Sequence, residues 1–102
     1  FQIKEYLHQN YAVPSLSVPD ISEHVRLSPT YVCTLFKNET GQTLNQYLTD
    51  YRIKMSKQFL SDPLYKITDI SAKVGYSDGN YYSKAFRKIV GLSPSEYREK
   101  IL

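Results

Sequence analysis

Two sets of polar residues stand at helical spacing and carry groups that can hydrogen-bond to the bases and phosphates of nucleic acids. The first set, at positions i, i+3, i+4 and i+7, is Thr30, Cys33, Thr34 and Lys37. The second set offers an amide, a hydroxyl and three cations: Asn80, Ser83, Lys84, Arg87 and Lys88. Asparagine can pair with adenine, lysine and arginine bind guanine, and threonine offers a methyl and a hydroxyl. Because exposed helix faces are commonly polar without any function, either set alone would be a weak indication.

The two sets lie in copies of one sequence pattern. In the first half of each copy, Ile21, Ser22 and Val25 recur as Ile70, Ser71 and Val74. In the second half, the recurring pairs are Tyr31 and Tyr81, Phe36 and Phe86, Gly41 and Gly91, and Tyr47 and Tyr97. An internal repeat restricts the architecture before any single element is assigned. Each copy predicts a short helix, a tight turn and a longer helix, which together form a helix-turn-helix unit.

Apolar spacing, caps, prolines and glycines predict where the helices begin and end. The expected helices cover about 1–10, 18–25, 29–40, 43–60, 67–74, 79–90 and 94–101. The longest would be about 27 Å long, and its expected apolar stripe is Leu44, Leu48, Tyr51, Met55 and Phe59. No segment alternates as a strand bounded by hairpin turns. The prediction is an all-α fold of seven helices, in which two helix-turn-helix subdomains, about 18–40 and 67–90, are joined by a long linker helix.

Each unit is expected to have a small residue where its two helices cross and apolar residues that hold the second helix on the first. Ser22 and Ser71 are the small residues. The predicted apolar residues are Ile21, Val25, Leu27, Val32, Leu35 and Phe36 in the first unit, and Ile70, Val74, Tyr76, Tyr82, Ala85 and Phe86 in the second. Gly75 at the second turn adopts a left-handed backbone at little cost. At the first turn, Arg26 must adopt that conformation at a cost or form a different turn.

Composition narrows the class of protein. A length of 102 residues fits one domain, and a net charge of +3 favours a polyanionic partner. No apolar run approaches the length of a membrane span. The single cysteine cannot form an intrachain disulfide and fits a reducing compartment, so we expect a cytoplasmic protein. The chain begins at Phe1 and has no signal-peptide pattern, so we read it as a piece of a longer protein.

Residue types that catalyse reactions or bind metals are not grouped in this sequence. It contains no paired carboxylate constellation, no glycine-rich phosphate loop and no Ser/His/Asp arrangement. His8 and His24 lack the spacing of metal ligands. We therefore predict that the protein is not an enzyme and that it uses no cofactor and no metal.

The two copies together resemble the DNA-binding domain of AraC/XylS-type bacterial transcription regulators. The residues that carry the resemblance are LSPTYVCTLFKNETGQTLNQYL (27–48), YRI (51–53) and ITDISAKVGYSDGNYYSKAFRKIVGLSPSEYR (67–98). The resemblance covers essentially the whole chain, as one domain of residues 1–102. It implies two helix-turn-helix subdomains whose second helices enter successive major grooves. The second motif also resembles the output domains of two-component response regulators.

The resemblance and the residue types together predict a role for each polar residue. The residues expected to read bases are Thr30, Cys33, Thr34, Asn80, Ser83 and Lys84. The residues expected to contact the DNA backbone are Tyr31, Lys37, Tyr81, Arg87 and Lys88. Relatives of this type usually have arginine in place of Thr34 and Lys84, so guanine recognition is expected to be weaker here. Lys66 takes the place of a usual Ser or Thr cap, so the helix after it is expected to start less firmly.

Two other classes of function fit the same pattern. One is a helical protein-interaction module that docks on RNA polymerase, and the other is an architectural protein that binds DNA without sequence preference. The expected partners are double-stranded DNA, RNA polymerase and the remainder of a full-length bacterial regulator, with no membrane partner. On the linker helix, Arg52, Lys54 and Lys57 are expected either to contact the DNA backbone or only to keep the helix solvated.

Overall fold

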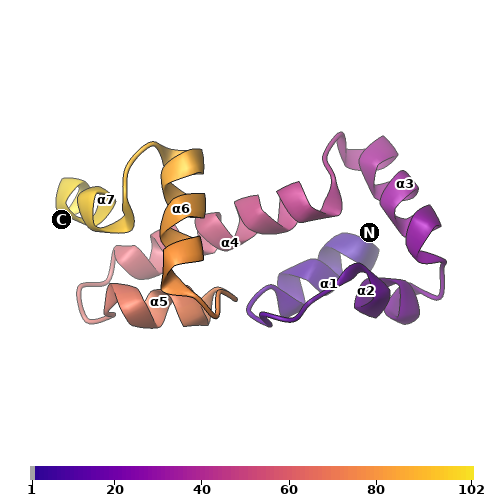
Figure 1. The fold of residues 1–102 in the computed structure, drawn as a ribbon, viewed down its shortest axis with the longest axis horizontal. Coiled ribbons are helices and arrows are strands. Elements are labelled where there is room, and N and C mark those ends of the chain that lie inside the picture. The colour runs from indigo at the N-terminus through magenta and orange to yellow at the C-terminus, as the bar shows by residue number, and fades with distance from the viewer. Residues whose placement is uncertain (1) are drawn as a thin grey trace.

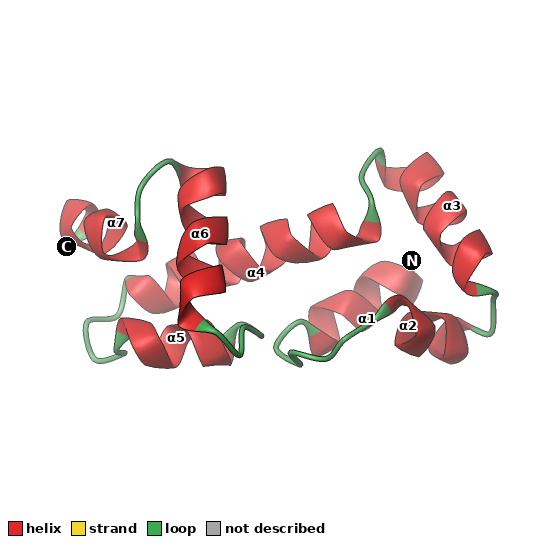
Figure 2. Ribbon diagram, in the orientation of Figure 1, coloured by secondary structure: helices red, strands yellow, loops and turns green. Residues whose placement is uncertain are grey.

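The computed structural model describes residues 2–102. Its helices are α1 (Gln2–Asn10), α2 (Val18–Val25), α3 (Pro29–Thr40), α4 (Leu44–Leu60), α5 (Ile67–Lys73), α6 (Gly79–Val90) and α7 (Pro94–Ile101). This part of the chain therefore has seven helices and no strand, which confirms the predicted all-α fold. Phe1, the start of the first predicted helix, lies outside the described residues. Loops and turns join the helices (Figure 2). None of the helices in residues 2–102 combines the length and hydrophobicity that a membrane crossing requires.

The molecule is elongated, with extents of 43 × 22 × 22 Å. Helix α4 runs through the middle, with α1, α2 and α3 around one end and α5, α6 and α7 around the other (Figure 1). Helices α2 and α3 pack on each other, as do α5 and α6, and α4 packs against members of both groups. The two helix-turn-helix units are thus separated along the linker helix, as the sequence predicted.

Two hydrophobic cores lie along α4, one for each unit. The buried residues of the first are Ile3, Leu7, Ile21, Val32, Phe36, Leu44 and Leu48. Those of the second are Ile53, Leu60, Ile70, Val74, Tyr82 and Phe86. The predicted core of each unit is largely confirmed, but Leu27 is exposed and its assignment to the first core is wrong. It lies in the turn between α2 and α3, where the chain reverses at the surface.

Helix α4 turns a different face to each core. Its buried residues are Leu44, Leu48, Ile53, Ser56 and Leu60. The step of five residues from Leu48 to Ile53 corresponds to about 140° around a helix. The predicted single stripe is therefore only partly confirmed in the second half of α4. Tyr51, Met55 and Phe59 are half-buried, and Met55 and Phe59 pack against the second core, but its fully buried residues from α4 are Ile53 and Leu60. The fully buried apolar residues of the two halves thus lie on different sides of the helix.

The crossing of the two helices is built in the same way in each unit. Ser22 and Ser71 are both buried, as predicted. The Ser22 hydroxyl donates to the carbonyl oxygen of Pro19 at 2.9 Å, and the Ser71 hydroxyl donates to that of Thr68 at 3.0 Å. A buried hydroxyl that finds an acceptor in its own helix avoids the cost of an unpaired polar group. The serine thus keeps the crossing narrow without leaving a polar atom unsatisfied.

The turns between the paired helices differ. Arg26 has φ 58° and ψ 42°, so it takes the left-handed conformation that the sequence predicted to be costly. It is the one residue other than glycine with positive φ in the described chain. Gly75, the corresponding residue of the second unit, has φ 96°. Both turns therefore use left-handed backbone, and the second does so with the residue that adopts it most readily.

Helix starts also differ in quality. Thr43 and Ser93 open α4 and α7 with reciprocal capping boxes, in which the side chains of Gln46 and Glu96 accept hydrogen bonds from the cap residues' N–H groups. Lys66 opens α5 without any side-chain cap. The expectation of a weaker start is confirmed in this respect, and a lysine there also places a positive charge at the positive end of the helix dipole.

We expect Lys66→Ser to raise the free energy of unfolding by about 0.5–1 kcal/mol, because the serine hydroxyl can accept a hydrogen bond from an orphan N–H of α5. Chemical denaturation followed by circular dichroism measures this change. Lys66→Ala is the matched control, since it removes the charge without adding an acceptor. Equal gains from the serine and alanine variants would attribute the effect to charge alone and contradict the capping argument.

Candidate nucleic-acid interface

Helix α3 presents the first polar set to solvent. Ser28 caps its start by accepting a hydrogen bond from the Tyr31 N–H at 3.2 Å, and Pro29 occupies the first helical position. Val32 and Phe36 are buried in the first core. Because these two residues face inward, the opposite face of the helix points outward, and all four predicted residues are exposed: Thr30, Cys33, Thr34 and Lys37. The inward anchors thus determine which residues α3 displays.

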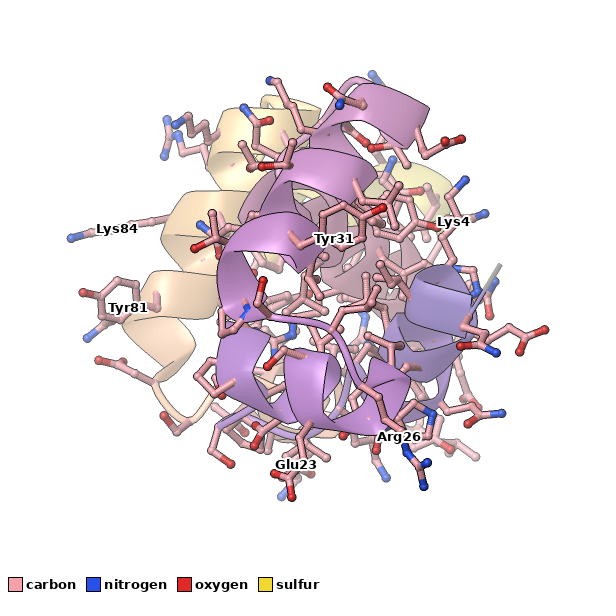
Figure 3. The ribbon with its side chains drawn as sticks, turned by 90° about the vertical axis from the view of Figure 1, so that its right-hand side faces the viewer. Lys4, Glu23, Arg26, Tyr31, Tyr81 and Lys84 are labelled. Carbon is pink, nitrogen blue, oxygen red and sulfur yellow. The ribbon has the colours of Figure 1, made fainter. Side chains whose placement is uncertain are left out.

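Helix α6 presents the second set by the same device. Asp78 caps it by accepting from the Asn80 N–H at 2.8 Å, and Tyr82 and Phe86 are the buried anchors. The predicted residues are again all exposed: Asn80, Ser83, Lys84, Arg87 and Lys88. In Figure 3, Tyr81 and Lys84 project from α6 to the same side of the molecule. The exposed set of α6 has three cations where that of α3 has one, so the positive potential is stronger on the second unit.

The tyrosines divide into two groups by exposure. Tyr31 and Tyr81, which the sequence placed at the starts of the two long helices as phosphate donors, are 53% and 70% exposed. Tyr82, the next residue along α6, is only 1% exposed. Burial raises the pKa of the Tyr82 hydroxyl, because the ionised form would lose its hydration. Exposed hydroxyls at equivalent places in both units are free to reach a ligand.

One cleft joins the two units. It has a volume of about 560 Å³, and Lys37 of α3 and Lys88 of α6 both line it. Its floor is the polar face of the first half of α4, with Asn45, Gln46 and Thr49. The structure thus brings together two residues predicted to contact backbone from opposite ends of the molecule. The other predicted residues stand separately on the two helices.

The floor of this cleft was not singled out from the sequence. Asn45, Gln46 and Thr49 lie on the side of α4 away from the predicted apolar stripe. Their spacing in the sequence identifies them as a polar helix face, but it does not show that this face lies between the two units. Asp50 also lines the cleft, where its carboxylate accepts a hydrogen bond from the Gln42 side chain at 2.9 Å. The cleft is therefore lined by polar side chains, by Lys37 and Lys88, and by the Asp50 carboxylate, which the Gln42 side chain holds in place.

The contacts of Arg52 differ from both roles that the sequence suggested for it. Both of its expected roles placed it on the surface, but its guanidinium turns inward and donates to the carbonyl oxygens of Tyr11 at 2.8 Å and Val13 at 3.0 Å. Its Cζ atom lies 5.4 Å from the centre of the Tyr76 ring. Burial lowers the pKa of Arg52, with Tyr76 opposing the change. The guanidinium is thus engaged by protein groups of both ends of the molecule.

The other two linker cations remain at the surface to different degrees. Lys54 is exposed, and Lys57 is half-buried with its ammonium 5.6 Å from the centre of the Tyr97 ring. Both histidines pack on tyrosines: His8 Nε2 lies 2.7 Å from the Tyr47 hydroxyl and its ring stacks on Tyr51, and the His24 ring centre lies 4.3 Å from that of Tyr6. In residues 2–102, no three His, Cys, Asp or Glu side chains are placed to hold a metal ion.

Comparison with known proteins identifies the family. A model described as a helix-turn-helix domain matches residues 21–100. A transcriptional regulator from Chromobacterium violaceum, described as containing an AraC-type DNA-binding domain, superimposes with a TM-score of 0.87 at 25% identity, over 98% of this chain and 88% of that one. The chain belongs to the AraC-type helix-turn-helix family. This family consists of DNA-binding domains of transcription regulators, so the prediction that the domain is not an enzyme is confirmed.

Other relatives of this AraC-type domain agree with that assignment. The Msm operon regulatory protein of Streptococcus mutans is 37% identical over 98% of this chain, which spans only 36% of that protein. The C-terminal domain of the response regulator yesN from Fusobacterium nucleatum has a TM-score of 0.90 at 28% identity, covering 94% of this chain and 93% of that one. The DNA-binding domain of AdpA, solved with a target DNA, shares the fold with a TM-score of 0.89 at 18% identity, covering 96% and 87%.

Proposed function

We propose that this AraC-type domain binds an asymmetric site in double-stranded DNA, with α3 and α6 in successive major grooves. The observation that carries the proposal is the cleft over α4, because it places Lys37 and Lys88, at the ends of the two exposed polar faces, on one side of the molecule. The length of the molecule, 43 Å, is sufficient to reach two grooves separated by about 34–36 Å. The AdpA domain, which has the same fold, was solved with a target DNA.

In this arrangement the exposed residues divide into those that read bases and those that hold the backbone. The first group is Thr30, Cys33, Thr34, Asn80, Ser83 and Lys84, and the second is Tyr31, Lys37, Tyr81, Arg87 and Lys88. Since α6 carries an amide and three cations, we propose that the second unit supplies most of the affinity. The first unit, with small hydroxyl and thiol side chains, contributes shape and methyl contacts, which discriminate less strongly than bidentate pairs.

The regulator to which this domain belongs is proposed to act in the bacterial cytoplasm, at the nucleoid. The likeness to the yesN C-terminal domain supports a role as the output domain of a response regulator. Contact with RNA polymerase stays a prediction for which no surface of the domain is assigned.

Selection from a pool of randomised oligonucleotides with residues 1–102 tests the proposal directly. We expect one enriched site with two unlike elements centred about 10 base pairs apart. Competition with unrelated DNA should show a preference of roughly a thousandfold or more. Tight binding without any enriched site would instead favour an architectural role, and no binding at low salt would favour a protein-interaction module.

Lys84→Ala should cost about 1–3 kcal/mol at the selected site and relax the preference at one base position, because a base-reading contact is lost. Titration of labelled duplexes that carry each of the four bases at that position measures both effects. The matched control is Lys100→Ala, which removes an exposed lysine from α7, outside both polar sets. Equal losses on the selected site and on random DNA would assign Lys84 to the backbone instead.

Lys88→Ala should weaken binding to all duplexes alike and make the slope of log K against log salt shallower by about 0.9, because one fewer phosphate is neutralised. Binding isotherms at several salt concentrations measure the slope. Lys100→Ala again serves as the control and should leave the slope unchanged. An unchanged slope for Lys88→Ala would remove the cleft from the DNA interface.

A further inference from the structure

The loop after α1, which packs with the first unit, meets the second unit beside the shared helix α4. The loop after α1 and the turn between α5 and α6 approach each other beside α4 (Figure 1). Arg52, from the middle of α4, donates to the Tyr11 and Val13 carbonyl oxygens in that loop. On the side of the second unit, it lies over the Tyr76 ring. We call these residues, together with Gly75, the Arg52 junction.

Gly75 makes this approach possible. It is buried, and a Cβ atom there would collide with the Tyr11 carbonyl oxygen and would lie 2.8 Å from Arg52 Nε. Its counterpart at the end of α6, Gly91, has a similar backbone with φ 89° but has nothing within 4 Å of a Cβ position. A side chain at position 91 would meet only the conformational penalty, whereas one at position 75 would also push the two units apart.

The arrangement of the cores makes the junction important. Within residues 2–102, Tyr11 alone packs against both cores, and each core otherwise contains residues of the helices at its own end of the molecule and of one half of α4. Apart from contacts such as these, the 17-residue helix α4 is what holds the two bodies in their relative orientation. Contacts between the bodies therefore add to the restraint that α4 provides.

The chemistry of Arg52 suits such a restraint. Its planar guanidinium directs two donors at two fixed carbonyl groups while its face lies over an aromatic ring, which a lysine ammonium cannot reproduce. Hydrogen bonds from a charged donor that is partly withdrawn from water are stronger and more directional than neutral ones. The contact joins all three bodies: the first unit, α4 and the second unit.

We propose that the Arg52 junction sets the separation and rotation of α3 relative to α6, and thereby the spacing of the two DNA elements that the domain accepts. Arg52 is a positioning residue in this scheme, since it acts through the units and not through contact with DNA. The statement about spacing rests on the proposed two-groove binding. The statement about the relative position of the units does not, so the two are tested separately.

The first experiment measures the position of the units without DNA. Cys33 is the only cysteine of the chain and is exposed on α3, and Ser95→Cys adds a second exposed site on α7. Spin labels at these two positions report the distribution of distances between the units by pulsed electron resonance. We expect a narrow distribution in the parent, a broader or shifted one in Arg52→Ala and Gly75→Ala, and no change in the matched control Gly91→Ala.

The second experiment measures the accepted spacing. One base pair inserted between the two elements of the selected site moves them apart by about 3.4 Å and rotates one by about 35°. We expect the insertion to weaken binding of the parent about tenfold and that of Arg52→Ala less than about threefold, because a loosened linkage adapts to either spacing. Affinity for each isolated element should change less than about twofold. Arg52→Lys should fall between the parent and the alanine variant.

The outcomes separate the two proposals. Narrow, unshifted distances in Arg52→Ala and Gly75→Ala would overturn the role of the junction, whatever the DNA results. Failure to select any paired site would refute two-groove binding, while the label distances would still decide the role of the junction. If Arg52→Ala does not fold, as judged by its thermal transition, the distances are compared in Arg52→Lys and Gly75→Ala instead. Parent-like distances in both of these variants would overturn the proposed role of the junction.

Discussion

The structure depends on α4, which supplies buried apolar residues to the cores of two small units at once. A helix-turn-helix of this size has too little apolar surface to form a stable core alone. The first half of α4 supplies Leu44 and Leu48 to one unit, and the second half supplies Ile53 and Leu60 to the other. Because the two faces are rotated about the helix axis, the units are also rotated relative to each other. Stability and the placement of the two exposed polar faces therefore have the same physical origin.

The two copies of the repeat share the buried residues that each unit needs for folding, but they differ in the residues exposed on α3 and α6. Both copies keep a buried serine at the helix crossing and an aromatic pair, Phe36 with Tyr47 and Phe86 with Tyr97, that meets nearly edge-on. The exposed faces differ in charge and in hydrogen-bonding groups. In the proposed mode of binding, two unlike surfaces in one chain need no palindromic site, because their own asymmetry matches an asymmetric one.

Helix boundaries and the exposed faces of α3 and α6 were predictable because they follow from local rules. Proline and serine at a helix start, glycine at its end and apolar residues at helical spacing act over a few residues. Once Val32, Phe36, Tyr82 and Phe86 are recognised as anchors, the orientation of their neighbours follows from helix geometry. The left-handed backbone at Arg26 was one of two outcomes that the repeat allowed, and the weak start at Lys66 followed from the resemblance to AraC/XylS-type domains.

The sequence alone determined the all-α class, the duplicated helix-turn-helix and the residues that α3 and α6 display, since each is encoded within a short stretch of chain. Only the tertiary structure decided that α4 buries Ile53, Ser56 and Leu60, because that choice depends on where the second unit packs. It also decided that Arg52 turns inward to carbonyl groups about 40 residues away in the chain. An arginine on a helix surface carries no local signal of such a partner, and only the folded chain brings the carbonyl groups within reach.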